Sequence, residues 1–456
     1  MSALKKGESI TIVSGGEATV LDDKPLGSGG QGEVYRVKYK NKEFALKWYT
    51  DTDIIKNDAF YVNINNNIHD GAPDSNFVWP IYLTEKHTDA YKKKSFGYLM
   101  NIFPKGYYEL GDILNTYVYE TDPKTNKKKK KMINTKNVEV SIRAAINIVR
   151  AFMSLHRAGK SYQDLNHGGI SVNIETGDVL ICDCDNVSST NLGIKGFPGY
   201  MAPEVLLGKN KPDMITDRFS LAVLLFKMLI RADPFWGKIQ DNYVSKPGED
   251  SDLLFYGKDP VFIFDPADTR NRPSNSNAKK FWPLFPKEIQ NLFIEAFVDG
   301  VKDRNRRPTE NKWFKTLMKA YTDLCICKCG KSVFNTQSKG PYVCPKCNAR
   351  YEILSTDVGN AVLCGGKRLF SFNTDAQSTG DIDHPTAEVK ESQKNPGVYA
   401  LFNLGKEKWG YISKDKNATA NSVEVGSGVR TEKILKITFT DVTINGKKIV
   451  RKGEVL

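Results

Sequence analysis

The chain of 456 residues has no long uninterrupted apolar segment. Its longest apolar run, residues 221–230, is about half the length that a membrane-spanning helix needs, and it contains Lys227. Residues 1–6 are not followed by the apolar stretch of a secretion signal. We therefore expect a cytoplasmic protein with no part in a membrane, and its length allows two or three domains.

Cysteine is scarce outside one short segment, because five of the eight cysteines lie within residues 325–347. Four of them form two close pairs separated by fourteen residues: Cys327 with Cys329, and Cys344 with Cys347. In a chain without an export signal, this spacing favours metal over disulfides and predicts four thiolate ligands for a structural Zn²⁺. We expect a zinc ribbon over residues 323–356. Cys325 stays open as an alternative first ligand, because the first pair is C-x-C rather than C-x-x-C.

The charge is unbalanced, with a formal net charge of +13 that suits polyanions such as nucleotides, nucleic acid or acidic proteins. Part of it comes from five consecutive lysines, residues 127–131, within the segment 119–136. That segment has almost no apolar residues, which is typical of a solvated insertion. An anion-binding patch is the alternative.

The chain also lacks an internal repeat, and it lacks the dinucleotide-binding order of strand, glycine loop and helix with an acid downstream. Its glycine-rich loop, residues 27–34 (GSGGQGEV), instead lies between strand-like segments, and Lys47 ends the next-but-one of them. Glycines let backbone N–H groups approach phosphate oxygens closely, and a lysine adds a positive charge for the same phosphates. The pattern predicts an ATP site.

Apolar periodicity separates a strand-rich part from a helical part. The expected strands are residues 9–13, 18–21, 33–39, 43–48, 79–82 and 96–100, with one Asn-rich helix at 54–68. The expected helices that follow are residues 138–157, 221–230, 287–298 and 309–321. A small strand-rich lobe joined to a helical lobe predicts an α+β bilobal fold with ligand in the cleft. Short alternating runs beyond residue 360 predict a small all-β sandwich over 357–456.

Three motifs follow one another in the helical part: YQDLN at 162–166, DCDN at 183–186 and PGYMAPE at 198–204. Together with the glycine loop and Ala45-Leu46-Lys47, their order resembles that of eukaryotic-type Ser/Thr protein kinases over residues 9–322. The resemblance implies a kinase domain over residues 1–322, with an N-lobe at 1–102 and a C-lobe at 107–322.

The resemblance also implies roles for individual residues. Lys47 would contact the α- and β-phosphates of ATP, Asp164 would orient the substrate hydroxyl and accept its proton, and Asp183 would carry Mg²⁺ or Mn²⁺. Glu204 would pair with Arg307, and Asp217 would brace the backbone of the catalytic loop. The residues implied to line the ATP site are Gly27, Gly29, Gly32, Val34, Ala45, Lys47, the gatekeeper Met100, and Asn101 and Phe103 in the hinge.

Several positions depart from the family pattern. The triplet Tyr162-Gln163-Asp164 offers no arginine to a phosphate on the activation loop. Gly169 stands where the family has a metal-binding asparagine, and we predict that Asn166 and Asp185 substitute for it as oxygen donors. Asn166 also occupies the place of the catalytic-loop lysine, and a solvated loop acid is the alternative role for Asp185. Residues 61–68 contain no acid to pair with Lys47, and Asn63 is the best match to the missing helix glutamate.

The order of kinase domain, zinc ribbon and β-domain resembles bacterial kinases of the tellurite-resistance-associated phosphorylation triad. The segments FVWP at 77–80 and ICDCDNV at 181–187 carry this resemblance. It implies a von Willebrand A-domain protein and a PP2C-like phosphatase as partners, beside protein substrates. The terminal domain is faintly similar to a forkhead-associated sandwich, but it lacks the Gly-Arg and Ser-x-x-His pairs of phosphothreonine binding.

The sequence therefore predicts an ATP- and Mg²⁺-dependent protein Ser/Thr kinase that transfers the γ-phosphate to protein hydroxyls. Autophosphorylation is expected within Ser188, Ser189 and Thr190. Two alternatives stay open: a pseudokinase scaffold that binds nucleotide without phosphoryl transfer, and a nucleic-acid-binding regulator that uses the lysine run and the zinc ribbon.

Overall fold

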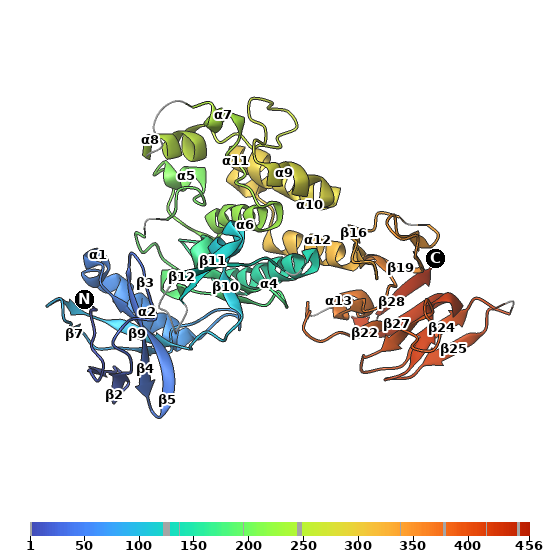
Figure 1. The fold of residues 1–456 in the computed structure, drawn as a ribbon, viewed down its shortest axis with the longest axis horizontal. Coiled ribbons are helices and arrows are strands. Elements are labelled where there is room, and N and C mark those ends of the chain that lie inside the picture. Colours follow the sequence, from blue (N-terminus) through green and yellow to red (C-terminus); the bar gives the residue numbers. More distant parts are fainter. Residues whose placement is uncertain are drawn as a thin grey trace. The chain divides into compact units, whose positions relative to one another are not determined.

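The computed structural model describes residues 2–121, 128–135, 137–194, 196–243, 249–337, 339–376, 380–415, 417–444 and 447–456 (Figure 1). Lys127 of the lysine run lies outside these ranges. The chain divides into two compact units. The first unit comprises Met1–Lys136, Asn147–Ala278 and Phe293–Glu310, and the second comprises Asn137–Ile146, Lys279–Leu292 and Asn311–Leu456. Across the described ranges, no helix is both long and apolar enough to cross a membrane.

A seven-stranded antiparallel sheet forms the N-terminal part of the first unit (blue in Figure 1). Its order is β1 (Ser9–Thr11), β2 (Glu17–Val20), β4 (Gly32–Tyr39), β5 (Lys42–Tyr49), β9 (Gly97–Met100) and β6 (Tyr82–Leu83), with β3 (Gly27–Ser28) paired to β4. Successive strand residues point to opposite faces. Leu46 and Trp48 therefore enter one buried cluster, while Ala45 and Tyr49 enter the other on the same side as Lys47.

The Asn-rich segment after β5 forms two helices rather than the single one predicted. These are α1 (Thr52–Ile55) and α2 (Asp58–Asp70), and the break between them is fixed by Asn57, whose side chain caps α2 by accepting the Phe60 N–H at 3.2 Å. The predicted strand 79–82 forms only at Tyr82, where β6 begins. Pro80 has no N–H for a ladder, and the Trp79 indole donates instead to the Asn67 carbonyl at 2.7 Å.

Helices dominate residues 110–323, which belong partly to the first unit and partly to the second. The predicted helix 138–157 is confirmed as α4 (Val138–Arg157), and the apolar run 221–230 is the C-terminal part of α6 (Met214–Ile230), which begins at a capping box of Asp213 and Thr216. The other helices from here to the cysteine segment are α3 (Leu110–Asn115), α5 (Pro203–Leu206), α7 (Lys238–Asp241), α8 (Glu249–Asp252), α9 (Ser276–Phe281), α10 (Lys287–Ile294), α11 (Gly300–Lys302) and α12 (Glu310–Asp323). Two π-helical turns, Leu253–Lys258 and Glu295–Asp299, follow α8 and α10.

Short strands and turns complete the first unit and carry its polar motifs. A three-stranded antiparallel sheet has the order β10 (Tyr107–Glu109), β13 (Ile170–Asn173) and β14 (Val179–Ile181). The 3₁₀ turn His167–Gly169 precedes β13, and the 3₁₀ turn Cys184–Asn186 follows β14. A small pair joins β7 (His87–Thr88) to β8 (Lys94–Ser95). The two turns thus hold the YQDLN and DCDN motifs beside one sheet.

Lys128 to Lys131 of the lysine run form a strand together with Met132. β11 (Tyr117–Thr121) and β12 (Lys128–Met132) make an antiparallel hairpin, and every residue of β12 is exposed as expected of a solvated segment. The Lys130 ammonium lies 3.9 Å from the centroid of the Tyr117 ring. Cross-strand cation–π contact of this kind explains why a run of like charges can remain extended and paired.

The second unit ends in two antiparallel sheets that share one core. The six-stranded sheet has the order β20 (Gly359–Val362), β19 (Ile353–Thr356), β28 (Lys447–Val455), β27 (Ile434–Ile444), β24 (Trp409–Ser413) and β25 (Ala420–Val423). The four-stranded sheet has the order β21 (Arg368–Leu369), β22 (Ala387–Glu391), β23 (Tyr399–Asn403) and β26 (Gly428–Arg430). Trp409, Ile437 and Leu401 meet in the same buried cluster. The short helix α13 (Ser371–Thr374) lies between β21 and β22 in sequence.

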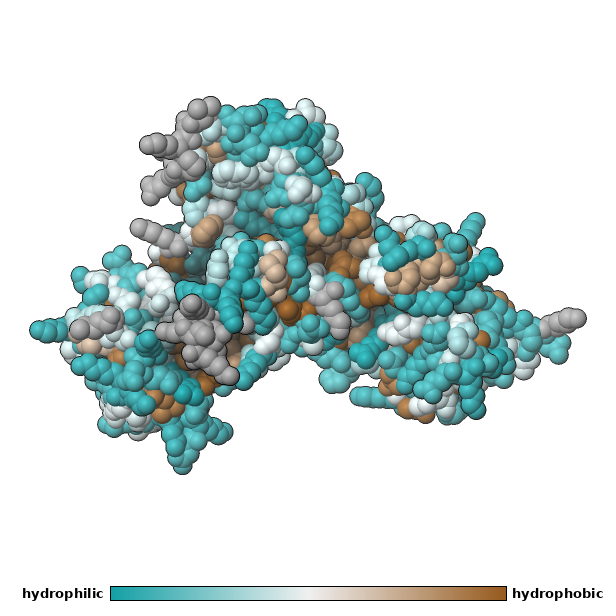
Figure 2. Space-filling model, viewed as in Figure 1, coloured by the Kyte–Doolittle hydropathy of each residue, from teal (hydrophilic) through white to brown (hydrophobic). Residues whose placement is uncertain are grey.

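Figure 2 shows mostly hydrophilic residues on the face in view, including the area over β24 and β25 in Figure 1. Charged residues make up 26% of the chain, and their display on the surface is what keeps such a face solvated.

Candidate active site

A cavity of about 680 Å³ lies in the first unit, which is large enough for a nucleotide. Eight of the nine residues predicted to line an ATP site line this cavity: Gly27, Gly29, Gly32, Val34, Ala45, Lys47, Met100 and Phe103. Asp164 and Asp183 line it as well. Asn101, Asn166 and Asp185 are not among the lining residues in the described part of the chain. Sequence reasoning missed Gln31, Glu109 and Asn186, which do line it.

The glycine loop is a tight turn between β3 and β4. Gly27 pairs with Val34 across the turn, and the Gly29 N–H donates to the Gly32 carbonyl at 2.9 Å. A Cβ at Gly32 would lie 2.1 Å from the backbone oxygen of Trp48 on β5. Only glycine therefore lets β4 pair this closely with β5 at the mouth of the cavity.

Lys47 is a buried cation held by three side chains. Its Nζ lies 2.8 Å from Asp185 Oδ2, 2.9 Å from Asp183 Oδ1 and 3.0 Å from Gln31 Oε1. Burial by itself disfavours the charged ammonium, but Asp185 and Asp183 raise the pKa of Lys47 well above its ordinary value. The lysine is therefore charged at neutral pH, with Asp183 and Asp185 as its counter-ions.

The two acids beside Lys47 lie in different surroundings. The Asp183 side chain is 44% exposed and lines the cavity, whereas the Asp185 side chain is fully buried. Asp185 accepts hydrogen bonds from the Tyr49 hydroxyl at 2.6 Å and the Tyr98 hydroxyl at 3.1 Å, in addition to Lys47. A solvated loop acid is thus excluded for Asp185, and its carboxylate oxygens are already engaged by donors.

Asp164 lines the same cavity and belongs to the YQDLN motif. Its Oδ1 accepts the Phe197 N–H at 3.2 Å and the Asn166 amide at 3.3 Å. Burial raises the pKa of Asp164 to about 6, against the lowering effect of these two hydrogen bonds. The carboxylate is therefore still mostly ionised at neutral pH, as an acceptor for a hydroxyl proton must be.

Asn166 serves the loop on which it lies. It caps the 3₁₀ turn His167–Gly169 by accepting the Gly168 N–H at 2.9 Å, and its amide nitrogen donates to the Asp164 carbonyl at 3.1 Å. Both ends of the side chain are thereby used within the loop, so this arrangement keeps Asp164 in place.

The glycine at 169 is explained by its neighbour. A Cβ at Gly169 would lie 2.7 Å from the hydroxyl oxygen of Tyr162, which itself donates to the Cys182 carbonyl. The tyrosine hydroxyl thus occupies the space that an asparagine side chain at 169 would need. Tyr162 and Gly169 therefore depart from the family pattern together, because the tyrosine hydroxyl needs a glycine beside it.

Helix α2 contacts the DCDN segment through amides. Asn63 and Asn67 each donate to the Val187 carbonyl at 2.8 Å. Asn63 also lies 3.4 Å from the Asp185 carbonyl, and Lys160 donates to Asn67 Oδ1 at 2.7 Å. The helix is therefore held to the loop by hydrogen bonds to its backbone.

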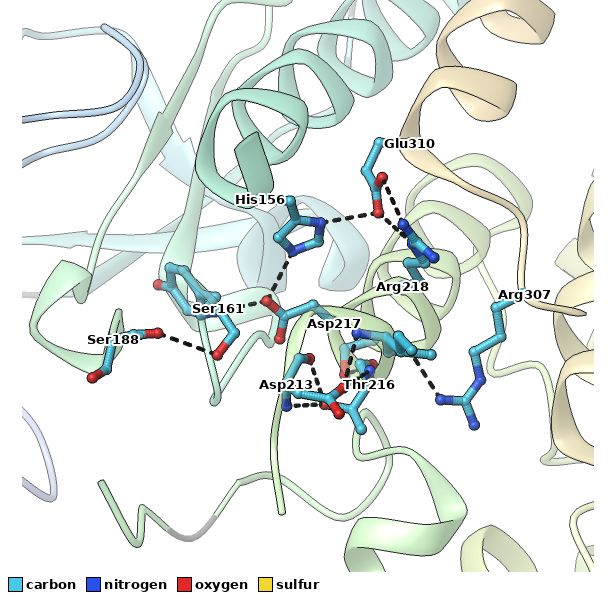
Figure 3. A network of polar contacts seen from close by, with 12 residues as sticks. His156, Ser161, Ser188, Asp213, Thr216, Asp217, Arg218, Arg307 and Glu310 are labelled. Atoms are coloured by element: carbon cyan, nitrogen blue, oxygen red, sulfur yellow. Dashed lines mark hydrogen bonds and ion pairs between the residues drawn. The ribbon is translucent and has the colours of Figure 1, made fainter. Parts of the chain in front are cut away.

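A buried histidine connects α4 to α6 beneath the catalytic loop (Figure 3). His156 lies between Asp217, at 3.1 Å from Nε2, and Glu310, at 2.9 Å from Nδ1. Burial alone would lower the pKa of His156, but the hydrogen bonds to Asp217 and Glu310 raise it to about 9. Asp217 also accepts the Tyr162 N–H at 2.7 Å, so it contacts the backbone of the catalytic loop as the sequence predicts.

Glu204 and Arg307 form the predicted pair. Two parallel contacts of 2.7 Å join the guanidinium to the carboxylate, and Arg307 is almost fully buried. Burial opposes ionisation of Glu204, yet Arg307 holds the pKa of that carboxyl below its usual range. The pair fixes α5 to the segment before α12.

Gln163 organises the segment after the DCDN motif. Its Nε2 donates to the Thr190 carbonyl at 2.5 Å and its Oε1 accepts the Leu192 N–H at 3.1 Å. The residue adopts a left-handed backbone with φ of 64° to do so. Ser188 is buried and bonded through its backbone to Ser161, while Ser189 and Thr190 are exposed.

The second unit contains the predicted group of four thiols. The sulfurs of Cys327, Cys329, Cys344 and Cys347 all lie within 4.8 Å of one another. Cys327 and Cys347 are 3.4 Å apart and Cys329 and Cys344 are 3.7 Å apart, close to the ~3.8 Å between sulfurs around tetrahedral Zn²⁺. Among the described residues, Cys325 lies outside this group and contacts Cys364 at 3.9 Å.

The pairs β15 (Leu324–Ile326) with β16 (Ser332–Phe334), and β17 (Tyr342–Val343) with β18 (Arg350–Tyr351), carry the four thiols on their turns. Burial raises the pKa of Cys344, but the N–H groups of Lys346 and Cys347, together with the neighbouring thiols of Cys327 and Cys347, hold it below its ordinary value. Backbone N–H groups aimed at a sulfur are what a thiolate ligand requires.

A glycine loop, a buried lysine and two acids around a nucleotide-sized cavity, between a small sheet and a helical part, define a phosphoryl-transfer fold of the kinase type. Comparison with known families agrees with this class. The chain matches the protein kinase domain over residues 21–316, well over half of its length, and belongs to that family.

Individual relatives are distant. The chain is 33% identical over 96 residues to Ser/Thr-protein kinase sck2 of Schizosaccharomyces pombe, over 20% of this chain and 15% of the relative. It is 26% identical over 234 residues to Ser/Thr-protein kinase AtPK2/AtPK19 of Arabidopsis thaliana, over 48% of this chain and 44% of the relative. An isozyme 2 form of cGMP-dependent protein kinase of Drosophila melanogaster is 36% identical over 95 residues. The chain thus spans less than half the length of these curated relatives.

Proposed function

We propose that the protein is an ATP- and Mg²⁺-dependent protein Ser/Thr kinase. The observation that carries the proposal is that Lys47, Asp164 and Asp183 line one nucleotide-sized cavity under the glycine loop. Lys47 binds the α- and β-phosphates, and backbone N–H groups of the loop approach the phosphate oxygens. Asp164 holds the substrate hydroxyl in line with the γ-phosphate and takes its proton. The names of the relatives support Ser/Thr specificity.

Two of the described residues that line the cavity have side-chain oxygens suited to a divalent metal. Asp183 has a partly exposed carboxylate that lines the cavity, and Asn186, which also lines it, has a buried Oδ1 without a hydrogen-bond partner among the described residues. We assign Asp183 and Asn186 as the residues that would hold the metal, with oxygen ligands of the kind that Mg²⁺ prefers. A bound metal would neutralise charge on the phosphates.

Further parts of the proposal rest on the sequence and on the second unit. Ser189 and Thr190 are the exposed hydroxyls for autophosphorylation. The four thiols would hold a structural Zn²⁺, in a ribbon over residues 323–356 between the kinase domain, 1–322, and a sandwich, 357–456. The triad resemblance supports a von Willebrand A-domain protein and a PP2C-like phosphatase as partners. The cytoplasmic location is proposed from the short apolar runs of the sequence.

The test is phosphoryl transfer by the purified chain from γ-labelled ATP, with Mg²⁺ or Mn²⁺, to itself and to a generic protein substrate. Asp164→Ala should lower the rate about 10²- to 10⁴-fold, because it removes the proton acceptor. Asp53→Ala, which removes an exposed acid of α1, should leave it unchanged. Equal labelling by wild type and Asp164→Ala would exclude catalysis by this site.

The pseudokinase alternative is favoured by two observations. Gly169 offers no ligand, and the carboxylate of Asp185 is engaged by Lys47 and two tyrosines. Binding of ADP with metal, together with no transfer to any substrate, would support that alternative over the kinase.

A further inference from the structure

In the family pattern, a glutamate on a helix pairs with the lysine of the cleft. Helix α2 has no such glutamate. The helix has two acids, Asp58 and Asp70, and they lie at its ends, where they pair with Lys86 at 3.0 Å and Lys160 at 2.6 Å. Between them, Asn63 and Asn67 donate to backbone carbonyls of residues 184–187. The helix therefore contacts the DCDN segment, and that segment contacts Lys47.

Asp185 has the surroundings of a fixed counter-ion. It is fully buried, and Lys47, Tyr49 and Tyr98 all donate to it. Tyr49 lies two residues after Lys47 on β5, and Tyr98 is the residue paired with Lys47 on β9. The three donors thus come from one face of two neighbouring strands, and they meet the carboxylate from the sheet side.

We infer that Asp185 is a positioning residue that holds Lys47 toward the phosphates, in place of a helix glutamate, and is not a metal ligand. The two acids then have different roles. Asp183 faces the cavity, and the buried Asp185 fixes the position of the Lys47 ammonium group. Because the anchor lies in the loop, the ion pair of Lys47 does not depend on an acid of α2. This inference rests on the proposed kinase function of the same cleft.

The first experiment compares steady-state kinetics of wild type, Asp185→Asn and two compensating variants. Asp185→Asn should lower kcat by about 10²-fold or more, because the lysine loses its buried counter-ion. Asp185→Asn/Asn63→Glu returns a carboxylate from the neighbouring position on α2, 3.4 Å from the Asp185 backbone, and should recover at least tenfold. Asp185→Asn/Asn66→Glu adds the same charge at an exposed position of α2 and should recover nothing. Wild-type kcat in Asp185→Asn, or equal recovery by both compensating variants, would overturn the inference.

The second experiment separates an anchor from a metal ligand, without relying on catalysis. Mn²⁺ binding in the presence of ADP is followed by electron paramagnetic resonance. Asp185→Asn should bind Mn²⁺ within about threefold of the wild-type affinity, whereas Asp183→Asn should lose the signal of bound Mn²⁺. Loss of Mn²⁺ in Asp185→Asn would make Asp185 a metal ligand. If the wild type transfers no phosphate, the proposed function fails, while Mn²⁺ retention and the stability test still judge the anchor.

A stability measurement covers the case in which Asp185→Asn folds poorly. Leaving Lys47 buried with one anion fewer should lower the thermal-unfolding midpoint. Asp185→Asn/Lys47→Met removes both members of the pair and should recover part of that loss. A double variant that loses as much as the two single variants together would show that the residues are not coupled, which would refute the anchor.

Discussion

Two departures from the family pattern in the cleft each involve a pair of residues that are neighbours in space. The hydroxyl of Tyr162 fills the space next to Gly169. Asp185 supplies the negative charge beside Lys47 that the neutral amide of Asn63, which lies beside the Asp185 backbone, cannot supply. Each exchange leaves a buried group with a neighbour of matching size or charge. Restoring the family residue at one position of a pair should therefore be more destabilising than restoring the family residues at both positions.

His156 gives the protein a pH-dependent stability. Its pKa rises from 6.5 to about 9 in the folded state, through Asp217 and Glu310. A raised pKa means that the folded state holds the proton more tightly than the unfolded state. The contribution is thus fully present below pH 6.5 and is lost as the pH rises toward 9, by roughly 3 kcal/mol at 1.4 kcal/mol per pH unit.

Urea unfolding of wild type and His156→Gln between pH 6 and 10 measures this contribution. The difference between their free energies of unfolding should be largest at pH 6 and should shrink steadily above pH 7. A difference that stays constant over this range would contradict a charged His156 in the folded state.

The activation segment illustrates control at the level of an element. In this chain the amide of Gln163 contacts both Thr190 and Leu192, where the family pattern has an arginine for a phosphate. Neutral hydrogen bonds need no modification to form. The segment is therefore held in the unphosphorylated chain.

Removing this amide should loosen the segment. Gln163→Ala is expected to lower kcat by about tenfold and to speed proteinase K cleavage within residues 188–194, because two hydrogen bonds are lost. Treatment of the wild type with a protein phosphatase should change kcat by less than about twofold.

Gln240→Ala is the matched control, since Gln240 is a buried glutamine that accepts the Gly237 N–H next to α7. It should leave kcat and the cleavage rate near the wild-type values. A large loss of activity on phosphatase treatment would show that phosphate, not Gln163, orders the segment.

At the level of the whole chain, the two units are stabilised differently. The first unit has buried clusters on both faces of its sheet, whereas the buried cluster of the second unit includes Cys327 and Cys344 beside the two β-sheets. A module as small as residues 323–356, which carry the four thiols, is expected to need a metal to remain folded. Zinc binding should thus contribute to the stability of the second unit alone.

Elemental analysis of the purified full chain should find one zinc per chain. Cys344→Ser should lose it and should become sensitive to proteolysis between residues 323 and 356. Cys325→Ser should keep it, because the Cys325 sulfur contacts Cys364 instead. Retention of zinc in Cys344→Ser, or its loss in Cys325→Ser, would contradict this ligand set.

Much of the cleft was predictable because its parts are local patterns. Glycines at fixed offsets, Lys47 at the end of a strand and Asp164 within a short motif follow from spacing along the chain. The predicted helix 138–157 also depends only on apolar periodicity, and it is confirmed. The predicted strand at 79–82 was largely wrong, since Pro80 lacks an N–H and the Trp79 side chain bonds to α2.

The sequence by itself determined the family, the nucleotide loop, the group of four cysteines and the positions that depart from the pattern. Only the tertiary structure decided what those departures do. Asp185 is 138 residues from Lys47 along the chain, and a burial that excludes water and brings two tyrosine hydroxyls is a property of packing, not of spacing. The same holds for Gly169, which is a glycine because the side chain of Tyr162 lies against it. Long-range packing assigns such roles because it alone sets which charges and volumes become neighbours.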